Sequence, residues 1–148
     1  MGNYWFCHIC KYSSCIEKVK RFMKQFLLVF IGGGLGSVFR FLLSQISFFN
    51  YSKFPAPTLL SNIVGCLILG LVLGNAIKNN HLNSPQTLLL ASGFCGGLTT
   101  FSTFAYENIS MIKSGDIGQL FFYTLMSLFL GFLSIYWSLY FKIISFII

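Results

Sequence analysis

The chain has 148 residues, of which 55% are hydrophobic and only 9% are charged, and its formal net charge is +7. A soluble domain averages about 25% charged residues, so this composition, with a mean hydropathy of +0.76, indicates a membrane protein. Each span needs about 20 residues, so four spans use most of the chain. No soluble domain large enough to be an enzyme remains.

The positive charge is concentrated at the N-terminus. The first 25 residues contain Lys11, Lys18, Lys20, Arg21 and Lys24. A basic segment beside a span favours the cytoplasmic side and anionic lipid headgroups. Nucleic-acid binding is the alternative, but no nucleic-acid-binding motif accompanies these charges. We therefore predict that residues 1–25 are a disordered basic extension and that residues 26–148 are a four-helix transmembrane domain.

The start of the chain and its cysteines give two further indications. Met23-Lys24-Gln25-Phe26 is typical of the start of a membrane protein, and no signal-peptide pattern precedes Phe26. The five cysteines are an odd number, and two of them fall in predicted spans, so they imply no disulfide framework.

The first span is predicted from about Phe26 to Phe48. Gly33, Ser37 and Arg40 lie at i, i+4 and i+7, on one helical face. Arg40 lies about 21 Å along the helix from Phe26, inside a hydrocarbon core of roughly 30 Å. An arginine at this depth normally faces the bundle interior or a water-filled cavity. The alternative is a side chain that reaches the far headgroups.

The second span is predicted from about Thr58 to Ile77. Gly70 and Gly74 form a small-xxx-small edge, which favours close packing of a neighbouring helix. Asn62 is a strongly polar side chain in this span. Its amide can donate hydrogen bonds to an anion, and hydrogen bonding between helices is the alternative role.

The third span, from about Thr87 to Ile112, is predicted to be interrupted. Three glycines fall within 93–97, and each weakens a helix by about 1 kcal/mol relative to alanine. A broken helix leaves backbone groups unpaired, which a membrane tolerates only where the gap is buried in protein, lines water or holds an ion. We therefore expect the functional site here, with the second half of the span beginning near Thr99.

The second half of this span combines aromatic and polar side chains. Phe101 and Phe104 are three residues apart on one face, and Ser102 and Thr103 lie between them. Such a pair of phenylalanines usually packs against lipid or core, but the adjoining break favours a role in the site. Glu107 is the acidic residue of the spans, and its position is typical of packing or capping.

The fourth span is predicted from about Ile117 to Ile144. Tyr123 and Ser127 lie at i and i+4, and Gly131 and Ser134 continue the same side. This gives a stripe of polar and small residues on an otherwise apolar helix. Packing of helices through small residues is the alternative interpretation, and it suits Gly131 and Ser134 better than Tyr123.

Three motifs in these spans together resemble the CrcB family, the Fluc fluoride channels. They are Gly33-x-x-Gly36-Ser37-x-x-Arg40, Thr58-Leu59-x-x-Asn62-x-x-Gly65 and the run GFCGGLTTFSTF from Gly93 to Phe104. The resemblance covers about residues 23–142, and the third motif is long and specific. It implies a fluoride-selective channel that exports fluoride passively across the bacterial cytoplasmic (inner) membrane. It also implies an antiparallel, dual-topology homodimer of four-helix subunits with two pores.

The resemblance further implies the site residues. The fluoride pore corresponds to Asn62, Phe101, Ser102, Thr103, Phe104, Tyr123 and Ser127, and the vestibule arginine to Arg40. A structural sodium ion at the dimer centre corresponds to the backbone carbonyls of Gly96 and Thr99. Where some relatives continue the polar track with hydroxyls, this chain has Gly131 and Ile135, and Ser134 is the substitute.

The chemistry of the side chains agrees with that resemblance. Fluoride is small and strongly hydrated, so a pore must replace its water with other donors, and hydroxyls and an amide can do so. The positive edge of an aromatic ring can meet an anion. Two other classes remain open: a small multidrug-type proton-coupled transporter, which would need an acid exposed to a cation chamber, and a structural subunit of a larger complex.

Overall fold

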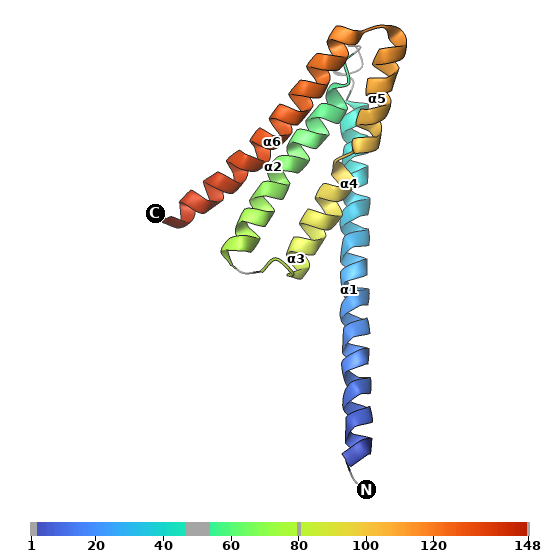
Figure 1. Cartoon of the computed structure of the whole chain (residues 1–148), viewed down its shortest axis with the longest axis vertical. Coiled ribbons are helices and arrows are strands. Elements are labelled where there is room, and N and C mark those ends of the chain that lie inside the picture. Colours follow the sequence, from blue (N-terminus) through green and yellow to red (C-terminus); the bar gives the residue numbers. More distant parts are fainter. Residues whose placement is uncertain (1–2, 47–53, 80, 148) are drawn as a thin grey trace.

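The structure is a computed structural model that describes residues 3–46, 54–79 and 81–147, and nearly all of these are helical. The elements are α1 (Asn3–Gln45), α2 (Ala56–Lys78), α3 (Pro85–Thr87), the π-helix η2 (Leu88–Cys95), α4 (Gly96–Leu98), α5 (Phe101–Ser114) and α6 (Ile117–Ile147) (Figure 1).

Four helical segments of the described chain are long and apolar enough to cross a membrane. They are Cys15–Gln45, Ala56–Lys78, Pro85–Ser114 and Ile117–Lys142. The third segment joins α3, η2, α4 and α5 across one interruption. The prediction of an all-helical membrane protein with four spans is therefore confirmed.

Helix α1 differs from expectation at its N-terminal end. We expected disorder up to residue 25, but the helix runs without interruption from Asn3 to Gln45 and extends beyond the other helices (Figure 1). Neither Gly nor Pro occurs between Asn3 and Ile31, and Lys, Arg and Glu favour helix. A helix already nucleated in the span can therefore extend outward without a new nucleus.

Helices α2 and α6 lie side by side, as Figure 1 shows. Gly70 and Gly74 are buried in α2, and a Cβ on either would crowd Ser138 or Lys142 of α6. Only glycine allows this approach, so the predicted packing edge of Gly70 and Gly74 is confirmed.

The glycines of the third span have a different role from the one inferred from sequence. Gly93 and Gly97 are helical, and they face the glycines of α1. A Cβ on Gly93 would come within 2.9 Å of Gly32 Cα, and one on Gly97 would collide with the backbone of Gly33. These glycines therefore let η2 and α4 pack directly on the backbone of α1, and the helix ends after them.

Candidate functional site

The interruption of the third span consists of two residues, Thr99 and Thr100. Their backbones are extended, with φ −77° and ψ 152° at Thr99 and φ −149° and ψ 119° at Thr100. Thr100 Oγ1 accepts a hydrogen bond from Thr103 N at 3.3 Å and so caps the N-terminus of α5. The prediction that the second half of the span begins near Thr99 is confirmed.

Asn62 of α2 forms hydrogen bonds with the backbone of the break. Thr100 N donates to Asn62 Oδ1 at 2.8 Å, and Asn62 Nδ2 donates to Thr100 O at 3.4 Å. In an uninterrupted helix Thr100 N would donate to Gly96 O, and Thr103 N would donate to Thr99 O. Both donors have other partners here, so these two carbonyls lack their usual helical donors.

Arg40 turns toward the same break. Its Nη1 donates to Thr99 O at 3.4 Å, and the residue is half-buried. It lines a cleft of about 240 Å³ together with Ser37 of α1, Thr58 of α2 and Thr103 of α5. Of the two roles considered for Arg40, the geometry favours an interior position over one at the far headgroups.

Glu107 binds two hydroxyl groups from neighbouring helices. Thr58 Oγ1 donates to its Oε1 at 2.6 Å, and Tyr123 OH donates to its Oε2 at 2.7 Å. The Tyr123 side chain is fully buried. Its single hydroxyl proton is therefore committed to Glu107, and the three residues join α2, α5 and α6.

The two phenylalanines after the break differ in their surroundings. The Phe104 ring lies 5.2 Å from the Tyr123 ring and 6.0 Å from the Phe101 ring, between ring centroids. Phe101 is 80% exposed in the isolated chain. Phe104 is thus anchored to α6, whereas Phe101 projects from the subunit surface.

The hydroxyls near the break form a small network. Thr100 Oγ1 lies 3.3 Å from Ser102 Oγ and donates to Thr103 Oγ1 at 3.1 Å. Because Thr103 Oγ1 accepts this bond, its own proton is free for another acceptor. Ser102 and Thr103 are both exposed at the start of α5.

The polar stripe on α6 continues from Tyr123 to Ser127. Ser127 Oγ is buried next to the Tyr123 hydroxyl, and it has no hydrogen-bond partner within the described chain. Ser134 is also buried, and its carbonyl accepts from Ser138 Oγ at 2.8 Å. Since Ser138 lies against Gly70 of α2, this end of the stripe packs between helices.

The structure thus gathers the predicted residues into two adjoining groups. Asn62, Arg40 and Thr99 meet at the break, and Phe104 and Tyr123 meet beside it. Sequence reasoning missed the roles of Thr58, Thr100 and Glu107. Two signals pointed to them: a threonine directly before a helix is a preferred cap, and a lone acid in an apolar span needs donors.

The carbonyls of Gly96 and Thr99 are the candidate ligands for sodium. They are hard oxygen ligands that lack their usual helical hydrogen-bond donors, and such ligands suit a hard cation. A Cβ on Gly96 would meet nothing within 4 Å, so this face is open to a second subunit. Among the described residues no three His, Cys, Asp or Glu side chains gather as an alternative metal ligand set.

Comparison with known proteins relates most of the transmembrane part of the chain to one family. The family described as "CrcB-like protein, Camphor Resistance (CrcB)" matches residues 27–139. The chain is 45% identical over 119 residues to the fluoride-specific ion channel FluC of Gloeothece citriformis, covering 80% of this chain and 96% of the relative. It is 43% identical over 115 residues to FluC of Phocaeicola vulgatus, covering 76% and 93%. Identity to FluC of Azobacteroides pseudotrichonymphae is 39% over 110 residues, covering 74% and 88%.

Nothing in these relationships supports the alternative of a small multidrug-type transporter. That reading required an acidic residue exposed in a cation chamber. Both oxygens of Glu107 instead accept hydrogen bonds from Thr58 and Tyr123.

Proposed function

The chain belongs to the CrcB family, and from that premise we propose that it is a fluoride-selective ion channel and not an enzyme. Fluoride crosses the membrane passively, down its gradient, and export lowers the cytoplasmic concentration. The protein spans the membrane several times, and the membrane is the bacterial cytoplasmic (inner) membrane.

One observation carries this proposal. The 45% identity to a fluoride-specific channel extends over 96% of that relative, and the family match from 27 to 139 reaches all four spans. The related region therefore includes the break and every residue that surrounds it.

The proposed pore passes the hydroxyls and the amide beside the break. Asn62 uses only one amide hydrogen on Thr100 O, so its second hydrogen is available to an anion. Thr103 also has a hydroxyl proton that is free within the described chain, and Ser127 Oγ has no partner there. These donors replace the water that fluoride loses on entry.

The two phenylalanines line the narrow part of the path. Their ring edges carry partial positive charge and can approach fluoride. Tyr123 contributes mainly by holding the Phe104 ring, since its own hydroxyl proton goes to Glu107. Arg40, in the cleft beside the break, attracts the anion to the entrance.

The working unit in this proposal is an antiparallel homodimer with two pores. The exposed Phe101 and the open face at Gly96 support it, because both lie on the surface of one subunit. One chain offers the carbonyls of Gly96 and Thr99, and its copy offers the same pair. A sodium ion bound by these carbonyls would supply fixed positive charge at the subunit interface.

Fluoride efflux from liposomes tests the function. The purified full-length chain is reconstituted in vesicles loaded with potassium fluoride, and a potassium ionophore then permits charge balance. We expect rapid fluoride release, recorded by a fluoride electrode. We expect no chloride release from matched vesicles that are loaded with potassium chloride. Release no faster than from protein-free vesicles would refute the channel, and equal chloride release would refute its selectivity.

A further inference from the structure

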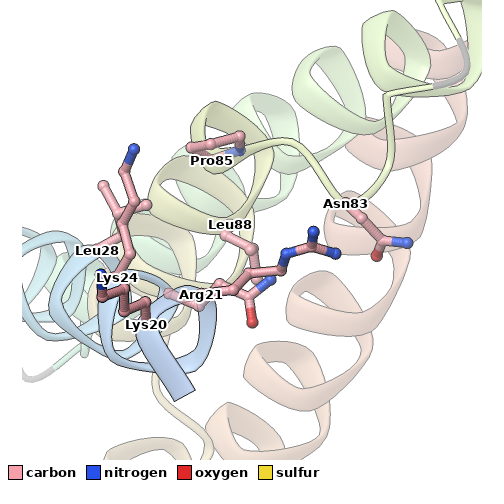
Figure 2. A pocket seen from close by; sticks show the side chains of 8 residues that line it. Lys20, Arg21, Lys24, Leu28, Asn83, Pro85 and Leu88 are labelled. Carbon is pink, nitrogen blue, oxygen red and sulfur yellow. The ribbon is translucent and has the colours of Figure 1, made fainter. Parts of the chain in front are cut away.

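A second cleft lies away from the break, between α1 and the start of α3 (Figure 2). Its volume is about 490 Å³, within the usual range for small-molecule sites. Lys20, Arg21 and Lys24 of α1 line one wall, and Asn83 lies on the opposite side. Figure 2 shows the Arg21 guanidinium pointing across the cleft toward Asn83. Three cationic side chains and an amide therefore line one space.

The positive charge of this cleft is not neutralised within the described chain. Lys20, Arg21 and Lys24 are exposed, and none of them forms an ion pair with a described residue. The nearest acid in sequence is Glu17, one turn earlier on α1. The other two acids are elsewhere: Glu107 binds Thr58 and Tyr123, and Asp116 binds Ser114. The cleft therefore presents a net positive surface to an anion.

The cleft is apolar at its other end. Leu28 of α1 and Leu88 of η2 line it together with Pro85. Lys20 and Leu28 are about 12 Å apart along the helix, and Pro85, which also lines the cleft, is the first residue of the third candidate span. The cations thus lie at the depth of lipid headgroups, and the leucines lie toward the acyl chains.

We propose that this cleft binds the phosphate headgroup of an anionic membrane lipid of the phosphatidylglycerol class. Lys20, Arg21 and Lys24 contact the phosphodiester, Asn83 donates to a headgroup oxygen, and an acyl chain runs along Leu28 and Leu88. The combination of cations with an apolar floor favours a lipid over free phosphate. The site is independent of fluoride conduction.

Lipid binding to the full-length protein tests this site. Native mass spectrometry would count phosphatidylglycerol molecules that remain bound, with phosphatidylcholine as the zwitterionic comparison. The triple variant K20Q/R21Q/K24Q removes the cations, and K18Q/K113Q/K142Q removes the same charge outside the cleft. Each basic residue near an anionic surface contributes about fivefold in affinity. We expect at least about a tenfold loss of phosphatidylglycerol affinity in the first variant and little change in the second.

Three results would overturn the proposal. Equal retention in the K20Q/R21Q/K24Q variant would show that the cleft does not bind the lipid. An equal loss in both variants would indicate diffuse attraction by net charge. Displacement of the lipid by millimolar inorganic phosphate would identify a site for a free anion. Fluoride efflux from vesicles of neutral lipid would verify that both variants are folded.

Discussion

Asn62 and Thr100 form a reciprocal pair in which the side-chain amide of α2 binds both backbone groups of the break. The Thr100 N to Asn62 Oδ1 distance is 2.8 Å and the Asn62 Nδ2 to Thr100 O distance is 3.4 Å. The pair compensates for the hydrogen bonds that the interrupted helix loses. Asn62 is therefore a structural support of the site as well as a candidate pore residue.

Asn62→Ala should destabilise the subunit in addition to slowing fluoride flux. It leaves the backbone amide of the buried Thr100 without a partner, which typically costs about 1–3 kcal/mol. Thermal unfolding of the purified variant should show a lower midpoint. Asn75→Ala is the matched control, because Asn75 is exposed on the same helix. An unchanged midpoint for Asn62→Ala would mean that the pair does not support the break.

Phe101→Ile and Phe104→Ile should each slow fluoride flux about tenfold or more, equivalent to roughly 1.4 kcal/mol in the barrier. The substitutions keep apolar bulk but remove the ring edge that meets the anion. Flux is measured with the fluoride electrode, and Phe129→Ile on α6 is the control, since Phe129 is also strongly exposed, at 66%. Normal flux in both variants would leave only the hydroxyl and amide donors to conduct the ion.

Phe101→Ile and Phe104→Ile should differ in their effect on the stability of the subunit. Phe101 is 80% exposed, so its replacement should hardly affect unfolding of the subunit. Phe104 contacts Tyr123 at 5.2 Å between ring centroids, so its replacement should lower the unfolding midpoint.

Tyr123→Phe and Thr58→Val should each destabilise the protein, because each removes a donor to Glu107. A hydrogen bond to a charged group contributes about 1.5–3 kcal/mol. The double variant should cost less than the sum of the single ones, because both donors serve one carboxylate. Tyr136→Phe is the control, since Tyr136 is 66% exposed. Strict additivity in a double-mutant cycle would argue against a shared role for Glu107.

Substitutions at two neighbouring glycines should distinguish packing within one subunit from assembly of the dimer. Gly97→Ala introduces a Cβ that collides with the backbone of Gly33, so the subunit itself should lose about 1–3 kcal/mol. A Cβ on Gly96 meets nothing within 4 Å, so the Gly96→Val subunit should fold but fail to dimerise. Light scattering in detergent reports the mass of each variant. A stable dimer of Gly96→Val would count against a subunit contact at these carbonyls.

The N-terminal charges should bias the orientation of the chain in the membrane. From Met23 onward, the four predicted spans place Lys24, Lys78 and Lys142 on one side of the membrane and Lys53 and Lys113 on the other, although Lys53 lies outside the described residues. This difference is small, so a form beginning at Met23 should insert both ways. The full-length chain adds basic residues before Met23 and should favour the N-terminus inside. Labelling of single cysteines from each side of the membrane measures the ratio, and one orientation for the Met23 form would refute dual topology.

The sequence alone determined the number of spans and the place of the interruption. Long apolar segments must be helical in a membrane because their backbone groups need internal partners. The prediction that a new helix begins near Thr99 is confirmed, and the helix begins there because Thr100, whose role the sequence reasoning missed, caps it by accepting a hydrogen bond from Thr103 N. Such signals act over a few residues, so a linear sequence is enough to detect them.

Only the tertiary structure decided what the other residues of the site contact. Gly93 and Gly97 were interpreted as weakening the helix, yet they allow backbone contact with α1. Thr58 and Glu107 are 49 residues apart, and Asn62 and Thr100 are 38 apart. Local spacing says nothing about such pairs, because they depend on which helices lie side by side and how each is rotated about its axis.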